Sequence, residues 1–314
     1  MHLIPDNIDY SKYAKQMDGQ HLKPASSWED AVIDRFASKS KPKTGAYLPW
    51  EKAGDDVLLR PGELSLWAGI NGHGKSLAIG QVMAWLLPYA KVAIASMEMP
   101  PPATMQRMIR QVAGTCAPTV QLMRRFMKWT DDRLWIYDQH DSVASDKILG
   151  MVRYAIQELG INHIVIDSLL KCGIAPDDYA RQKQFVDRLC WSVRHTQAHI
   201  HLVVHMRKGR TEDDIPDKFD VKGAGEIVDL ADNLFIVHRN KGKESRRDKG
   251  EDVQEFEPDA TIDVSKQRHG EWEGRLNLYW HANSQQLIGS PNHPAIPYPE
   301  NIFDGLSPED SYLQ

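Results

Sequence analysis

The sequence predicts an α/β fold with a mostly parallel central sheet and antiparallel edge strands. From Leu48 onward, strand-like apolar runs alternate with helical patterns, which is typical of such sheets. A glycine-rich turn joins one of these strands to one of these helices, and the last three strand-like runs have only loops between them. At 314 residues, with 41% hydrophobic and 26% charged residues, the chain suits one large domain with extensions or two small domains.

Composition divides the chain into three parts. Residues 1–45 are polar and mixed, with one amphipathic candidate helix at 27–38 opened by a Ser-Ser cap, and we interpret them as an N-terminal extension and linker. Residues 46–289 form the α/β domain. The tail at 290–314 is rich in proline, so we expect it to be extended or docked on a neighbouring copy rather than folded alone.

The elements of the domain follow from their apolar spacing. The expected strands are short apolar runs: 64–70, 91–99, 134–138, 163–169, 200–205, 232–239, 260–268 and 275–281. The expected helices carry apolar residues at helical spacing: 76–87, 146–159 and 181–197, the last with Phe185, Leu189 and Val193 on one face.

Composition also limits the functional class. The first residues are polar and charged where a signal peptide would be apolar, and no apolar run is long enough to cross a bilayer. Cys116, Cys172 and Cys190 are each isolated, which favours neither a disulfide framework nor a zinc module. We therefore expect a cytoplasmic protein of a reducing compartment. The net charge of −5 argues against a uniformly basic nucleic-acid surface but leaves a local basic groove open.

The stretch GINGHGKS, residues 69–76, fits the phosphate-binding pattern G-x-x-x-x-G-K-[ST]. A strand-like run precedes it and a helical run follows, which is the context that this pattern requires. Backbone amides would face the phosphates, Lys75 would reach the β- and γ-phosphates, and the Ser76 hydroxyl would bind Mg²⁺. His73 is a spacer in this interpretation. The expected nucleotide-binding residues are Gly69, Asn71, Gly72, His73, Gly74, Lys75, Ser76 and Leu77.

Two acidic residues follow apolar strands and complete the expected hydrolytic site. Asp167 ends HIVID, where it would hold the Mg²⁺ through a water, and Asp138, which ends LWIYD, is the rival candidate. Glu98 follows the strand after the phosphate loop, and a carboxylate there would polarise the attacking water. This role for Glu98 assumes that its strand lies next to the strand of the phosphate loop. A solvent-facing strand end is the alternative.

Two cations near the end of the domain suit a phosphate on another copy of the chain. Lys266 and Arg268 alternate along an expected strand, so both side chains would project from one face. An arginine that reaches a γ-phosphate across an interface stabilises charge in the transition state. An ordinary solvated strand end is the alternative.

Taken in order, these motifs resemble the helicase domain of the replicative hexameric helicases of the RecA superfamily, which include the DnaB type, the phage primase-helicases and Twinkle. The resemblance extends from about residue 60 to about residue 287. Its segments are SMEMP (96–100), HIVIDSL (163–169), HLVVHMRK (201–208), DVKGAGEIVDLADNLFIVHRNK (220–241) and SKQRHGEWEG (265–274). We expect no primase in residues 1–45, so the chain resembles a phage- or prophage-type helicase unit, free-standing or cut from a primase-helicase.

The resemblance implies a role for each motif. Glu98 would be the catalytic base, Asp167 the Walker B carboxylate, and His205 the sensor of the γ-phosphate. A satisfied core histidine is the alternative for His205. Lys266 and Arg268 would act on the nucleotide of the neighbouring subunit.

The same resemblance implies where a single strand of DNA would bind. The segment with Lys222, Gly223 and Gly225 would line the central channel of a ring, with support from Arg207, Lys208 and Arg210. Lysines and loop amides suit phosphates, and a mobile solvated loop is the alternative. The basic segment at 239–250 is interpreted first as an exposed hairpin loop and second as an outer DNA contact.

We therefore expect an ATP-dependent DNA helicase that uses ATP, or another NTP or dNTP, with Mg²⁺. By resemblance it would form a homo-oligomeric ring, hexameric in this family, and translocate 5′→3′ on single-stranded DNA in the cytoplasm of a bacterial host. A primase or other replisome proteins are candidate partners, and no membrane is implied. Two alternatives stay open: a RecA- or KaiC-like oligomeric ATPase that does not unwind DNA, and an assembly factor gated by nucleotide.

Overall fold

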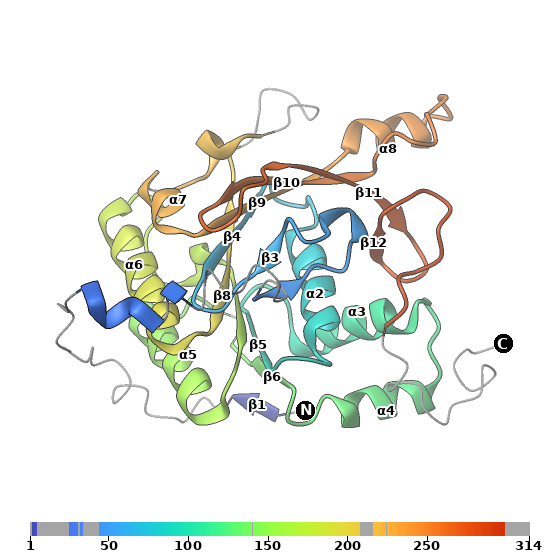
Figure 1. Ribbon diagram of the computed structural model, residues 1–314. Helices are drawn as coiled ribbons and strands as arrows, with labels where there is room; N and C mark the ends of the chain where they lie inside the picture. Colours follow the sequence, from blue (N-terminus) through green and yellow to red (C-terminus); the bar gives the residue numbers. More distant parts are fainter. Residues whose placement is uncertain are drawn as a thin grey trace.

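A ten-stranded sheet forms the centre of the computed structural model, which describes residues 2–4, 25–30, 32–33, 44–139, 141–207, 216–223 and 225–298 (Figure 1). The strand order is β1-β6-β5-β7-β8-β4-β9-β10-β11-β12. Pairs from β1 to β9 are parallel, whereas β10, β11 and β12 pair antiparallel at one edge. The predicted fold class, with its antiparallel edge, is confirmed.

All eight expected strands are present, and their bounds differ from the expected ranges by a few residues. They are β4 (Leu64–Gly69), β5 (Val92–Ser96), β6 (Leu134–Tyr137), β7 (His163–Asp167), β8 (His199–His205), β9 (Asn233–Arg239), β10 (Ala260–Gln267) and β11 (Gly274–His281). Four very short strands were not expected: β1 (His2–Ile4), β12 (Gln286–Ile288), and the separate pair β2 (Ala46–Tyr47) and β3 (Leu58–Leu59).

The three expected helices are present as α2 (Lys75–Leu86), α5 (Ser145–Leu159) and α6 (Tyr179–Thr196). Four more were not expected: α3 (Pro101–Ala113), α4 (Val120–Trp129), α7 (Glu226–Leu230) and α8 (Lys241–Asp248). Local signals explain two of them. Pro101 stands at the first position of α3, where its missing N–H costs nothing, and Gly114 ends the helix in a left-handed conformation. Thr119 caps α4 by accepting a 3.1 Å hydrogen bond from the amide of Leu122.

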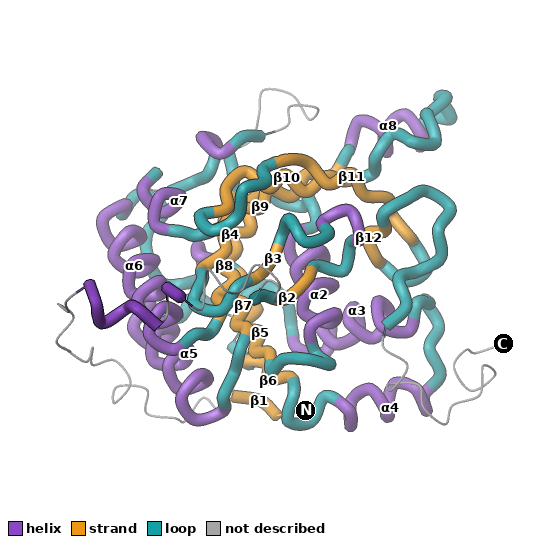
Figure 2. Tube along the Cα trace, in the orientation of Figure 1, coloured by secondary structure: helices purple, strands orange, loops and turns teal. Residues whose placement is uncertain are grey.

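The helices cover both faces of the sheet, so its central strands are buried on both sides (Figures 1 and 2). In β7, Ile164 and Ile166 belong to the core shared with α5 and α6, whereas Val165 between them belongs to the core shared with α2 and α3. This alternation explains why the strands read as continuous apolar runs rather than as alternating ones.

The two ends of the chain are only partly described. Residues 25–30 and 32–33 are helical or 3₁₀-helical, and the rest of the candidate helix at 27–38 lies outside the described residues. Residues 290–298 of the tail are extended, as expected, but they pack on their own chain rather than on a neighbour. Tyr298 is buried, its hydroxyl lies 3.3 Å from the carbonyl of Gln81 on α2, and its ring packs edge-on against Trp85. Burial of this aromatic ring fixes the tail. In the described part of the chain, no helix combines the length and apolarity that a membrane span requires.

Three buried histidines stack in the sheet, away from the phosphate loop. The ring centroids of His199 and His201 on β8 are 4.5 Å apart, and His163 on β7 lies 5.4 Å from His201. Because the indole of Trp67 donates to Nδ1 of His201 at 3.1 Å, the Nε2–H of His201 donates to Nδ1 of His163, also at 3.1 Å. Burial lowers the pKa of His163 to about 4 and that of His199 to about 3, and it holds that of His201 well below its usual value. All three rings are therefore neutral in the folded protein.

We expect the protein to lose stability below pH 6.5. The folded-state pKa values lie below the unfolded value of 6.5, so the unfolded chain binds protons first, and stability present above pH 6.5 falls as the pH drops toward 4. Each histidine contributes a loss of about 2 kcal/mol by pH 5. His201→Gln keeps an acceptor and a donor but does not titrate. Urea unfolding at pH 7 and pH 5 should therefore show a smaller pH effect in the variant, and an equal effect in both proteins would contradict this account.

Candidate functional site

The phosphate loop connects the end of β4 to the start of α2. Gly74 precedes the helix in a left-handed conformation, with φ of 86°, which glycine adopts without strain. A Cβ at Gly69 would lie 2.5 Å from the carbonyl oxygen of Val237 on β9, so the close approach of the two backbones requires glycine. His73 is buried, and its Nδ1 accepts a 3.2 Å hydrogen bond from the amide of Arg239, which ties the loop to β9. This contact agrees with a spacer role for His73.

Lys75 and Ser76, the first residues of α2, point toward the ends of neighbouring strands. The Lys75 ammonium lies 2.8 Å from the carbonyl of Gly69 and 3.0 Å from that of Ile70, so it folds back over the loop. The Ser76 hydroxyl donates a 2.5 Å hydrogen bond to Asp167 at the end of β7. The hydroxyl and carboxylate oxygens that Mg²⁺ prefers are therefore in contact, with the N-terminus of α2 beside them. Ser76 pairs with Asp167 rather than with its rival Asp138, which follows β6.

Three more side chains meet at the same edge of the sheet. Ser168 donates a 2.8 Å hydrogen bond to Glu98 Oε1, and Nε2 of His205 lies 3.3 Å from the Ser168 hydroxyl and 3.6 Å from Glu98. The structure thus brings Glu98, Asp167 and His205 together. The assumption that β5 pairs with the phosphate-loop strand is wrong, because β7 and β8 lie between β5 and β4. Glu98 still reaches the site because parallel strands end at one edge and β5 pairs with β7, which carries Asp167.

Charges at this edge shift the pKa values of the site. The neighbouring His205, together with a hydrogen bond from Ser168 and the charge of Lys75, holds the pKa of Glu98 at about 2, against the effect of burial. Glu98 is therefore ionised at neutral pH. Burial lowers the pKa of Lys75 and raises that of Asp167, while the opposite charges of this pair counteract both shifts. A cation bound at Asp167 would favour its ionised form.

Arg107 on α3 is a site residue that the sequence analysis missed. Burial lowers the pKa of this guanidinium, and the charge of Asp167 opposes that shift, which places the two groups near each other. The sequence carries a usable signal, because Met105, Met108, Ile109 and Val112 are spaced as one face of a helix opened by prolines.

A cavity of about 140 Å³ lies on the other side of the phosphate loop, and the sequence analysis missed it as well. Its walls combine apolar side chains with the aromatic ring of Trp280 and the ion pair between Arg239 and Glu244. The sheet order explains its position: β4 lies between β8, which carries His205, and β9, which leads to this cavity. The lining residues are His73, Gly74, Leu77, Arg239, Glu244, Asp259, Ala260, Trp280 and Leu287.

Lys266 and Arg268 lie at the opposite edge of the sheet from their own phosphate loop. Gln267, between them, pairs with Asn233, which pairs in turn with Ser65 at the start of β4. Both cations donate to the carbonyl of Asp229 at the end of α7, at 3.0 Å and 2.6 Å, so they project from one face as expected. Arg268 also forms a 3.0 Å ion pair with Asp232. Neither cation can act on a phosphate bound by its own chain.

The expected DNA-binding residues are partly described. The amide of Lys222 donates to the carbonyl of His205, and the amide of Arg207 donates to that of Asp220, both at 2.8 Å. These bonds attach the segment to the end of β8. Gly223 follows with φ of 116°, and Gly225 precedes α7. Lys208 and Arg210 lie outside the described residues.

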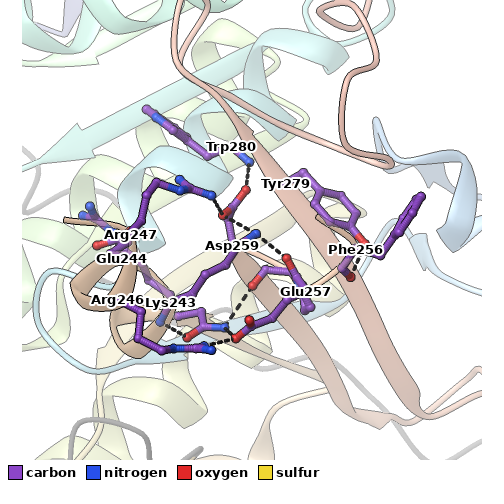
Figure 3. A network of polar contacts seen from close by, with 12 residues as sticks. Lys243, Glu244, Arg246, Arg247, Phe256, Glu257, Asp259, Tyr279 and Trp280 are labelled. Atoms are coloured by element: carbon purple, nitrogen blue, oxygen red, sulfur yellow. Dashed lines mark hydrogen bonds and ion pairs between the residues drawn. The ribbon is translucent and has the colours of Figure 1, made fainter. Parts of the chain in front are cut away.

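The basic segment at 239–250 forms helix α8, so the prediction of a hairpin loop is wrong. Figure 3 shows the reason. Lys243 is buried and lies 2.8 Å from Asp259, with its ammonium also bonded to the carbonyl of Glu257. Arg246 pairs with Glu257, and Arg247 pairs with Asp259 at 3.2 Å. Since four of the six cations of this segment are paired within the chain, counting Arg239 with Glu244, they hold α8 on β10 and β11 rather than form a free basic face.

The fold and the phosphate loop define a RecA-like P-loop nucleotide-binding domain. Residues 57–288 match the family model described as the DnaB-like helicase C terminal domain, and the chain belongs to this family. It is 24% identical over 232 residues to the Twinkle homolog protein, chloroplastic/mitochondrial, of Arabidopsis thaliana. That alignment covers 68% of this chain and 32% of the relative, so the chain spans about a third of that protein.

Two solved structures share the fold. One is a separate ATPase domain, which has a TM-score of 0.70 and 15% identity, covering 85% of this chain and 99% of that one. The other, a DnaB-like replicative helicase described with its interactions with primase, has a TM-score of 0.70 and 14% identity, covering 85% of this chain and 68% of that one. These likenesses support the RecA-like architecture.

Proposed function

We propose that this chain is the motor domain of a ring-forming replicative DNA helicase that hydrolyses ATP, or another NTP or dNTP, and translocates on single-stranded DNA. The observation that carries the proposal is the convergence of Lys75, Ser76, Asp167 and Glu98 at one sheet edge, with Ser76 and Asp167 2.5 Å apart. Membership of the DnaB-like helicase family supports the helicase class.

In this proposal the chain holds the nucleotide at the start of α2. The loop amides and Lys75 bind the phosphates, and Ser76 and Asp167 would hold Mg²⁺, which supplies positive charge to the phosphate oxygens. Glu98, ionised because its pKa is about 2, orients and polarises the attacking water. His205 lies beside Glu98 and shares the Ser168 hydroxyl with it, so it is suited to detect a γ-phosphate at this edge.

Each hydrolytic site would be shared between two copies of the chain. Lys266 and Arg268 lie at the far edge of the sheet from their own phosphate loop, so a role at a phosphate requires a neighbouring subunit. A ring satisfies this requirement at every interface, because a head-to-tail contact that closes gives each subunit one cradle and one pair of fingers. The six-membered size, the 5′→3′ direction, the phage or prophage origin and a cytoplasmic location rest on the family resemblance. So does a primase or replisome partner.

The nucleoside would bind in the cavity beside β9, since the groups that act on the γ-phosphate lie on the other side of β4. We expect Trp280→Ala to raise the KM for ATP by about tenfold with little change in kcat, because a ring that stacks on the base binds substrate and transition state alike. Trp280→Phe should largely restore the KM. The Asp259 contact uses the backbone amide of Trp280, so the α8 network remains in both variants. An unchanged KM in Trp280→Ala would contradict this placement.

The ATPase rate of the purified chain, measured with and without single-stranded DNA, tests the proposed function. Strong stimulation, together with unwinding of a forked duplex, supports the helicase. Stimulation with strand exchange but no unwinding would favour a recombinase-like ATPase. A rate that DNA does not change would overturn the proposal and favour an assembly factor.

A further inference from the structure

A cavity of about 290 Å³ joins the end of β8 to the connection between β7 and α6. One wall carries two cations, Arg207 and Lys222, from the expected DNA-binding segment. Another wall carries Tyr179 and Leu170, which are 50% and 39% exposed. Core packing does not explain two such exposed apolar groups side by side with cations.

Both walls are held by hydrogen bonds. The side-chain amide of Gln182 donates to the carbonyls of Ala175 at 3.1 Å and Pro176 at 3.0 Å, which fixes the connection that precedes Tyr179. Tyr179 is the first residue of α6, whose cap Asp178 accepts a 3.0 Å hydrogen bond from the amide of Arg181. On the other wall, the 2.8 Å bond from the backbone amide of Lys222 to the carbonyl of His205 holds the cation near the cavity.

The chemistry of the two walls matches the two parts of a nucleotide. A phosphate needs cations and amides but gains little from an aromatic wall, whereas an unpaired base stacks on an aromatic ring whatever its sequence. We propose that this cavity takes one nucleobase of the bound single strand, stacked on Tyr179 and flanked by Leu170, while Arg207 and Lys222 bind the adjoining phosphates. The inference rests on the proposed function, and it adds a base contact to a path otherwise made of backbone contacts.

The test compares natural and abasic oligonucleotides of equal length, bound to the full chain with a non-hydrolysable ATP analogue. Removing the bases should weaken binding to the unmodified protein by about tenfold or more. Tyr179→Ala should weaken binding of the natural strand and shrink the abasic penalty, and Tyr179→Phe should keep most of both. Tyr89→Ala removes a tyrosine that is 77% exposed beyond the C-terminal end of α2, and it should match the unmodified protein.

Salt dependence separates the two walls. Lys222→Ala should make the affinity fall less steeply with salt, because one phosphate contact is lost, whereas Tyr179→Ala should leave the slope unchanged. An abasic penalty in Tyr179→Ala equal to that of the unmodified protein would overturn the inference. The inference also fails if the penalty disappears only in Phe219→Ala, whose ring is 80% exposed on the neighbouring segment. If the unmodified protein binds no single strand, the proposed function itself fails with it.

Discussion

Replacing Arg268 with alanine should lower the rate of ATP hydrolysis in the assembled protein by about 10³- to 10⁵-fold. The guanidinium would stabilise charge on the γ-phosphate of a neighbouring subunit during transfer, and Lys266 beside it would not replace its forked donors. Steady-state ATPase measurements with single-stranded DNA present provide the check. Arg268→Lys should recover little of the rate, because an ammonium lacks the planar fork of guanidinium donors.

Arg268 also pairs with Asp232, so loss of that ion pair needs its own control. Arg194 provides it, since its guanidinium lies 3.9 Å from the same carboxylate but projects from α6. Arg194→Ala should leave the ATPase rate within a few-fold of the unmodified protein while weakening the same local contact. Equal losses in Arg194→Ala and Arg268→Ala would show that the effect is structural.

Replacing Glu98 with glutamine should lower the hydrolysis rate by about 10²- to 10⁴-fold while leaving nucleotide binding nearly unchanged. The amide keeps the shape of the side chain and can still accept the hydrogen bond from Ser168, but it cannot take a proton or polarise water as a carboxylate does. Rate measurements and binding of a fluorescent ATP analogue, taken together, separate the two effects.

Asp138 offers a matched carboxylate for this comparison. It follows β6, which lies on the far side of β5 from β7, and Ser76 bonds to Asp167 instead. Asp138→Asn should therefore leave the ATPase rate nearly unchanged. A Glu98→Gln variant that hydrolyses ATP at the unmodified rate would remove Glu98 from the proposed mechanism.

The sequence was sufficient for the parts of the fold and site that depend on local patterns. Apolar runs predicted all eight principal strands, and the loop pattern at 69–76 predicted a turn whose first glycine the structure requires, because Gly69 abuts the backbone of β9. The strand-end rule also placed Asp167 and Glu98 at one edge of the sheet.

Features that depend on pairing between distant segments were not predictable in this way. Strand order is set by packing across the sheet, so the distance of β5 from β4 left no local signal. Helix α8 has no apolar face in its sequence because ion pairs, chiefly that of the buried Lys243 with Asp259, replace apolar packing. Trp280 reaches the nucleotide cavity from β11, far along the chain from the phosphate loop. Its place in the cavity wall follows only from the folded sheet.

The central claim is that two neighbouring subunits build each hydrolytic site, and ATPase measurements on mixed assemblies test it most directly. Subunits carrying Arg268→Ala keep an intact cradle, and subunits carrying Lys75→Ala keep intact fingers, so each mutant assembly should be inactive alone. Mixing them restores interfaces with both an intact cradle and an intact Arg268, and we expect activity to return. Activity that stays at the sum of the two separate mutants would contradict a site shared between subunits.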